Sequence, residues 1–156
     1  MAQDENSAPV LIAYDGSEFA KVAIAEAARQ LGAGRTAIVL TVSEPLERIP
    51  FLGAGGVPLD STSVKGILDA ANQGAQKVAE EGVQLARDAG LEAEPLVVTG
   101  GPIWNRIVEA ADQLGASLIV IGSRGRSGLT YAVLGSVAAA VAQHSKRSVL
   151  IVHRRP

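Results

Sequence analysis

Three glycines and a serine toward the end of the chain have the types and spacing of a phosphate-binding loop. Gly122 and Gly125 follow a short apolar run, and nine residues separate Gly125 from Gly135-Ser136. A side chain at Gly122 would keep a ligand away from the backbone, and a positive φ at Gly125 would turn successive amide N–H groups toward one point. A helix is expected to begin near Gly135-Ser136, where unpaired amides and the helix dipole favour an anion. The spacing therefore predicts a cradle for phosphate groups.

Charged and hydroxyl side chains lie beside this loop and after a second apolar run. Arg124 and Arg126 can add positive charge, and Ser123 and Ser127 are interpreted as phosphate or turn donors. Asp15 closes the second run, just before Gly-Ser. An aspartate in that setting can simply order a turn, whereas a carboxylate near a triphosphate can share a magnesium ion that keeps its waters. We favour the ligand role because Asp15 follows a predicted buried strand.

Composition and motifs argue against several other kinds of site. The chain has no cysteine, which excludes disulfides, thiol catalysis and cysteine zinc sites. His144 lies near a helix end and His153 in the tail, so no zinc site is expected. The motifs G-x-x-x-x-G-K-[ST] and G-x-S-x-G are absent, as is G-x-G-x-x-G after the first strand. No general base or nucleophile stands out, so a dedicated enzyme is not favoured.

Short apolar runs alternate with helical patterns along the whole chain and must position these residues. The predicted strands are 10–14, 37–42, 95–98, 117–121 and 149–152. The predicted helices are 18–31, 64–89, 103–114 and about 133–145. Strict alternation predicts an α/β fold with one parallel sheet and helices on both faces. We expect one domain over residues 9–156 after a disordered lead, residues 1–8.

Ligands of such sheets bind beyond the carboxyl ends of the strands, where the strand order reverses. If the first and fourth strands are neighbours there, the Asp15 turn and the glycine loop face each other. The set Gly122-x2-Gly125-x9-Gly135-Ser136, with Asp15 after the first strand, resembles the universal stress protein family and its ATP-binding branch. The resemblance spans about residues 8–154. It implies a five-stranded sheet in the order 3-2-1-4-5, a Rossmann-like fold of the adenine nucleotide α-hydrolase type.

The resemblance also implies roles for individual residues. Asp15 would lie at the ribose or at a bound metal, and Ala13 and Val42 would line the adenine pocket. The residues implied to hold the phosphates are Gly122, Gly125, Gly135, Ser136 and Val137. The chain departs from the pattern at two positions. Many ATP-binding relatives have proline where Ala13 stands, and some have a hydroxyl residue at Ala138.

The leading functional interpretation is a regulatory module of the stress response that binds ATP or another adenine nucleotide, with Mg²⁺ as a candidate companion. A weak ATP hydrolase on the same fold is one alternative. Its base would come from the loop 44–62, where Glu44, Glu47 and Asp60 are available. A second alternative is a protein that binds cyclic AMP. A third is an interaction protein that keeps the fold and binds no ligand. Whether the loop 44–62 closes over the site stays open.

Charge and hydropathy indicate which partners to expect. The formal net charge is -2, which does not favour nucleic acid. The N-terminus lacks a secretory pattern, and no apolar run has the length of a membrane span, so a soluble cytoplasmic protein without membrane contact is expected. The last strand is apolar and would be an exposed edge. Pairing of residues 148–153 with a second copy would cover it, and the resemblance also implies such a homodimer.

Overall fold

Strands and helices alternate strictly in the computed structural model, which describes residues 7–43, 60–126 and 134–155. In chain order the elements are β1 (Val10–Ala13), α1 (Glu18–Leu31), β2 (Thr36–Ser43), α2 (Ser61–Asp88), β3 (Glu92–Thr99), α3 (Ile103–Gln113), β4 (Leu118–Gly122), α4 (Ser136–His144) and β5 (Ser148–Val152). Most of the predicted lead 1–8 and most of the loop 44–62 lie outside the described residues. The single domain over 9–156 stays a prediction.

The five strands form one parallel sheet in the order β3-β2-β1-β4-β5, which confirms the predicted fold class and strand order. β1 lies in the middle, with Ile12 beside Val39 of β2 and Val120 of β4. Both faces of a central parallel strand are covered, so such a strand is apolar throughout. All four residues of β1 are buried accordingly. The strand order reverses between β1 and β4, so their carboxyl ends flank one crevice.

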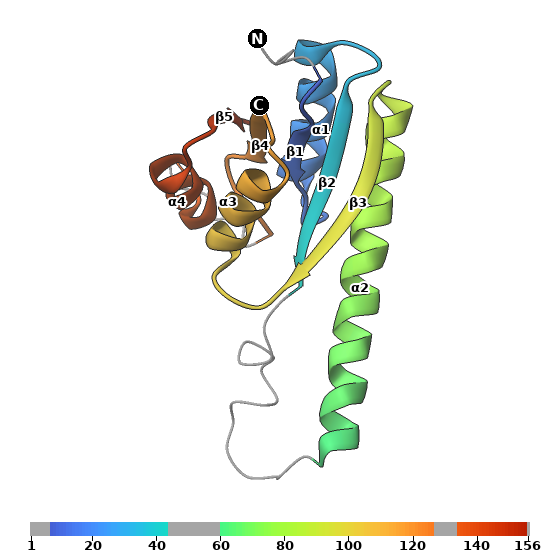
Figure 1. The fold of residues 1–156 in the computed structure, drawn as a ribbon. Helices are drawn as coiled ribbons and strands as arrows, with labels where there is room; N and C mark the ends of the chain where they lie inside the picture. Colours follow the sequence, from blue (N-terminus) through green and yellow to red (C-terminus); the bar gives the residue numbers. More distant parts are fainter. Residues whose placement is uncertain (1–6, 44–59, 127–133, 156) are drawn as a thin grey trace.

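Helices cover the two faces of the sheet in pairs, α1 and α2 on one face and α3 and α4 on the other (Figure 1). Successive residues along a strand pack into the two hydrophobic cores in alternation. Ile12 packs in the core under α1 and α2, whereas Leu11 packs in the core with Ile107 of α3 and Val141 of α4. This period of two follows from the alternation of side chains along a strand. Each strand end is therefore held from both sides.

In the described part of the chain, the buried residues of the long helix α2 all lie in its C-terminal half. Its first turns run past the ends of β2 and β3 in Figure 1, and its buried residues begin at Ala75. Gly82 brings the packed half very close to the sheet. A Cβ built there would lie 2.7 Å from Cδ1 of Tyr14 and 2.8 Å from Cγ1 of Val39, so only glycine fits without a shift.

The two edge strands differ in how they end the sheet. β3 carries Pro95, a residue that edge strands tolerate because one side of the strand needs no partner. β5 is the other edge, as the sequence predicted, and its pairing with a second copy stays a prediction. Within the described residues, none of the helices has the length and apolar character needed to cross a membrane.

Candidate functional site

A cavity of about 360 Å³ opens at the carboxyl ends of β1, β2 and β4. All nine predicted site residues line it, although they come from four separate stretches of the chain. They are Ala13, Asp15, Val42, Gly122, Arg124, Gly125, Gly135, Ser136 and Val137. Arg126 and Ala138 also line this glycine-loop cavity. The convergence follows from the topology, because the carboxyl ends of parallel strands meet at one edge of a sheet.

The N-terminus of α4 forms one wall of the cavity. Gly135 is its N-cap residue, and no side chain caps the helix start. The N–H of Gly135 donates to the carbonyl of Ser123 at 2.7 Å, and Ala139 donates to the carbonyl of Gly135 at 2.9 Å. The helix therefore provides no partner for the amides of the three residues between, which begin with Ser136. Together with the helix dipole, these amides suit an anion.

Asp15 faces the glycine loop across the cavity and also orders its own turn. Its Oδ1 accepts the backbone N–H of Ser17 at 2.9 Å, and Ser17 Oγ accepts the N–H of Ala20 at 3.2 Å to cap α1. The other carboxylate oxygen, Oδ2, would lie 3.0 Å from a Cβ built on Gly125. The turn interpretation and the site interpretation of Asp15 are thus compatible, because each uses a different oxygen.

Two glycines are present for reasons that the sequence did not predict. A Cβ on Gly122 would lie 2.9 Å from the carbonyl carbon of Phe19 and 3.0 Å from its oxygen, so the close packing of α1 on β4 requires glycine there. The prediction that Gly122 is kept bare for a ligand is therefore wrong about which neighbour the residue faces. The predicted positive φ at Gly125 is also wrong, because its φ is not positive. The missing side chain at Gly125 instead lets the loop approach Asp15.

Apolar side chains form the opposite wall of the cavity. Ala13 and Val42 lie there as expected, and Ile103 and Ile107 of α3 join them. Both isoleucines fall within the predicted helix 103–114, and Ile107 is 2% exposed. Periodicity places a residue on the inner face of a helix, but it does not tell a packed core from the wall of a cavity.

The end of β1 is tied to its neighbours by Tyr14. Its hydroxyl donates to Oε1 of Glu81 on α2 at 2.6 Å, and its carbonyl accepts the hydroxyl of Thr41 at 2.9 Å. Burial and the hydrogen bond to Glu81 raise the pKa of Tyr14, while the same hydrogen bond, followed by Lys21, lowers the pKa of Glu81. Tyr14 stays protonated at neutral pH and fixes the strand end that carries Asp15.

The other described candidates, Asp60 and Ser123, are not among the residues that line this cavity. Asp60, an available base for a hydrolase, accepts the N–H of Ser63 at 2.8 Å as the N-cap of α2. Glu44, Glu47 and Ser127 lie outside the described residues. Ser123 lines a different pocket, considered below. In the described part of the chain, no three histidine, aspartate or glutamate side chains gather as a metal site.

The sequence and the fold of this chain both match those of known proteins. The Universal stress protein family matches residues 7–153. Universal stress protein YxiE of Bacillus subtilis is 33% identical over 92% of this chain and 97% of its own length. A universal stress protein in complex with cAMP matches with a TM-score of 0.64 and 28% identity, over 95% of this chain and 98% of that one.

The universal stress protein from Archaeoglobus fulgidus in complex with dAMP matches with a TM-score of 0.58 and 25% identity, over 94% of this chain and 98% of that one. Sequence and structure therefore agree along nearly the whole length. With its sheet order, its glycine spacing and its cavity at the β1–β4 edge, the chain belongs to the universal stress protein family.

Proposed function

We propose that this chain binds an adenine nucleotide in the glycine-loop cavity, that the nucleotide is ATP, and that binding serves regulation of the stress response rather than turnover. The observation that carries the proposal is the uncapped start of α4 at Gly135-Ser136, facing Asp15 across a cavity that has an apolar wall. Two relatives of the same family with bound cAMP and dAMP support the adenine part of the ligand.

The cavity offers a separate surface for each part of a nucleotide. The apolar wall with Ala13, Val42 and Ile103 suits the flat face of adenine. The carboxylate of Asp15 suits ribose hydroxyls, which donate hydrogen bonds to it. The free amides of α4, the Ser136 hydroxyl and the Arg124 guanidinium suit the phosphates. Mg²⁺ would be held by phosphate oxygens with Asp15, because Mg²⁺ in nucleotide sites keeps most of its waters.

Regulation is favoured over turnover by the protonation chemistry of the cavity. Among the described lining residues, Asp15 is the one carboxylate, and its Oδ1 already accepts the N–H of Ser17. No histidine is among them, and Asp60 caps α2 instead. A hydrolase would need a base that activates water near the terminal phosphate. Turnover at the spontaneous rate, unchanged in Asp15→Asn, is the expected result of a steady-state assay.

The direct test is mass spectrometry of the ligand released from freshly purified protein, followed by calorimetric titration with ATP. We expect an adenine nucleotide to be released and ATP to bind with one site per chain. Ser136→Ala should weaken binding severalfold, whereas Ser63→Ala at the distant start of α2 serves as the matched control. No bound nucleotide and no heat with ATP, AMP or cAMP would overturn the proposal. Gly122→Val is unsuitable as a test, because its side chain would collide with Phe19.

Cyclic AMP is a second candidate, because one matched family member was solved in complex with cAMP. A cyclic monophosphate offers fewer oxygens to the α4 amides than a triphosphate does. We therefore expect Ser136→Ala to weaken ATP more than cAMP. Competition between the two ligands ranks them, and a preference for cAMP would change the ligand while leaving the site in place.

We also propose that two copies pair through residues 148–153, and that the protein works in the cytoplasm, where ATP is available. The support for the dimer is the apolar edge strand β5, whose Val149 and Ile151 are only partly buried. Light scattering at micromolar concentration should give twice the chain mass. A monomer mass would contradict the dimer, and cell fractionation tests the location.

A further inference from the structure

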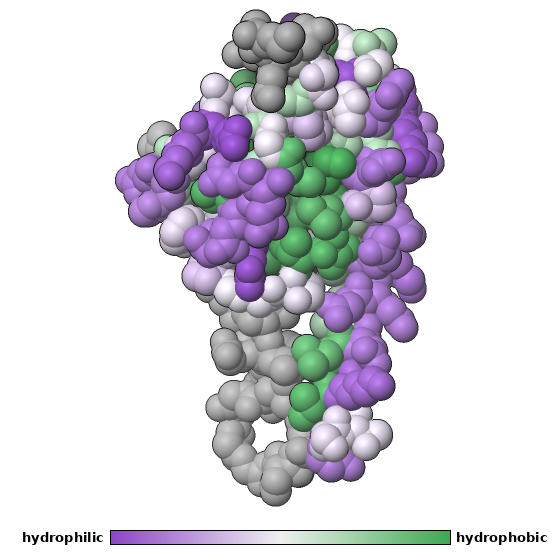
Figure 2. Space-filling model, viewed as in Figure 1, coloured by the Kyte–Doolittle hydropathy of each residue, from purple (hydrophilic) through white to green (hydrophobic). Residues whose placement is uncertain are grey.

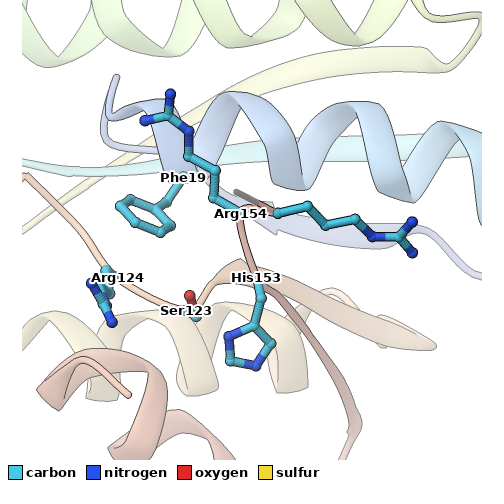
Figure 3. Close-up of a pocket in the computed structure, with 6 residues that line it drawn as sticks. Phe19, Ser123, Arg124, His153 and Arg154 are labelled. Atoms are coloured by element: carbon cyan, nitrogen blue, oxygen red, sulfur yellow. The ribbon is translucent and has the colours of Figure 1, made fainter. Parts of the chain in front are cut away.

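A second pocket of about 310 Å³ lies beside the glycine loop. We call it the tail pocket, and its lining comes from three elements: Phe19 of α1, Ser123 and Arg124 after β4, and the tail residues 153–155 after β5 (Figure 3). Arg124 lines both the tail pocket and the glycine-loop cavity, and the other residues that line the tail pocket are absent from the lining of the cavity.

Ser123 lines the tail pocket with a side-chain hydroxyl. The residue is 2% exposed, and its Oγ makes no hydrogen bond within the described part of the chain. Its backbone is held on both sides, by the bond from its N–H to Val152 at 2.8 Å and by the bond from Gly135 to its carbonyl at 2.7 Å. In Figure 3 the hydroxyl points toward the space between Phe19 and Arg154. The Ser123 hydroxyl can therefore donate a hydrogen bond to a ligand atom in the tail pocket.

Three arginines contribute to the lining of this pocket, namely Arg124, Arg154 and Arg155. The Arg124 guanidinium lies 5.7 Å from the centre of the Phe19 ring, and neither Arg124 nor Arg154 forms an ion pair with a described carboxylate. The nearby carboxylate of Glu26 is already engaged, because hydrogen bonds from Arg29 and Gln30 lower its pKa to about 2, with a smaller contribution from Arg155. The pocket therefore keeps an excess of guanidinium charge.

We propose that the tail pocket binds the phosphate group of a small phosphate monoester, as an anion site separate from the glycine-loop cavity. Guanidinium groups pair with two oxygens of a phosphate at once, and the Ser123 hydroxyl supplies a further donor at the buried end. The Phe19 ring gives an apolar wall for the carbon part of the ester. The inference does not depend on the nature of the nucleotide in the other cavity.

The test is a titration of ¹⁵N-labelled protein with phenyl phosphate and with inorganic phosphate, followed by NMR. We expect the amide signals of Ser123, His153 and Arg154 to move. The double variant Arg154→Gln with Arg155→Gln should lower the affinity for phenyl phosphate about tenfold or more, because hydrogen bonds to charged groups are lost. Both side chains are exposed, so the variant should unfold at the same temperature as the wild type.

Three controls decide between the outcomes. Lys77→Gln with Lys146→Gln removes the same charge elsewhere and should leave the affinity unchanged. Ser123→Ala should weaken binding severalfold without loss of stability. Ser136→Ala should weaken the binding of ATP but not the binding of phenyl phosphate. The two proposed sites can therefore fail independently, and the experiment shows which one has failed.

Three results would overturn the inference. The first is unchanged affinity for phenyl phosphate in the double arginine variant. The second is signal changes confined to residues 135–138, which would place the phosphate in the glycine-loop cavity. The third is an equal loss of affinity in the lysine control, which would show general charge attraction instead of a specific site.

Discussion

Two helices begin at the same edge of the sheet, and their first turns are finished in opposite ways. At α1, Ser17 caps the N–H of Ala20, and Asp15 in turn accepts the N–H of Ser17. At α4, the N-cap residue is Gly135, which has no side chain to cap with. Both helices follow strands that lie side by side, β1 and β4. One helix start is completed by its own residues, and the other leaves its amides available to a ligand.

The difference shows that the residue type at the N-cap decides whether a helix start is capped by its own side chain or left uncapped. Serine at an N-cap supplies an acceptor oxygen, whereas glycine leaves the position bare. The capped start of α1 also positions Asp15. Its Oδ1 accepts the N–H of Ser17, while its Oδ2 faces Gly125. The site therefore needs one satisfied helix start and one unsatisfied helix start, opposite each other.

The largest expected effect comes from filling the open end with charge. Ser136→Asp places a carboxylate at the first position of α4. The helix dipole stabilises a negative charge there, but the charge repels phosphates. We expect ATP affinity to fall about 100-fold, or about 2.7 kcal/mol, while the melting temperature stays the same or rises. Calorimetry and thermal unfolding measure the two. Wild-type affinity in this variant would show that phosphates do not lie at α4.

The next largest effect is expected at the contact between Gly122, at the end of β4, and Phe19 in the first turn of α1. Gly122→Ala would push a methyl group into the backbone of Phe19 in the first turn of α1, and we expect about 2 kcal/mol less stability toward urea. Gly74→Ala, in open space on α2, is the control and should gain about 0.5 kcal/mol by helix propensity. A Gly122→Ala variant as stable as the wild type would contradict the close packing of α1 on β4.

The caps themselves should differ in stability by a smaller amount. Ser17→Ala removes the cap of α1 and should cost about 1 kcal/mol of unfolding free energy. Ser136→Ala removes a hydroxyl that caps nothing, and we expect a change within about 0.5 kcal/mol. Urea unfolding of the two variants compares them directly. Equal losses would remove the distinction between a capped and an open helix start.

The smallest effect is expected for the hydrogen bond between Tyr14 and Glu81, which fixes the end of β1 next to Asp15. Tyr14→Phe removes the hydrogen bond to Glu81, whose side chain is half exposed, so we expect a loss of about 0.5 kcal/mol at pH 7. Because this bond lowers the pKa of Glu81 below 4.5, its contribution is complete above that pH and is lost as the pH falls through the lowered value.

Unfolding free energies of wild type and Tyr14→Phe should therefore converge in acid. Glu81→Gln is the matched control, because it keeps the shape of the side chain and removes its titration. A difference between wild type and Tyr14→Phe that stays constant from pH 7 to pH 3 would contradict the assignment of this effect to Glu81.

Much of the architecture could be read from short-range patterns. The apolar runs gave all five strands, and Ser17 and Gly32 marked the two ends of α1 as the structure has them. Helix and strand signals lie within a few neighbouring residues, so periodicity and capping carry them. The convergence of nine site residues was also predictable, because parallel strands of a known order bring their carboxyl ends together.

Contacts between distant segments were not predictable in the same way. The neighbour of Gly122 is Phe19, about a hundred residues earlier in the chain, and a glycine alone does not say whether it makes room for a helix or for a ligand. Ser123 was interpreted as a phosphate or turn donor beside Gly125, but it lines the tail pocket. Local spacing gives the turn, whereas the side to which the hydroxyl points depends on how β5 and α1 pack.

By itself, the sequence determined the alternation of strands and helices and the capped start of α1, because these depend on residue type and local hydrogen bonding. The tertiary structure alone decided that Phe19 fills the space at Gly122, that Ile107 faces a cavity, and that the tail reaches Ser123. Those features arise from packing between segments far apart along the chain, and the free energy of such packing depends on the shapes that meet.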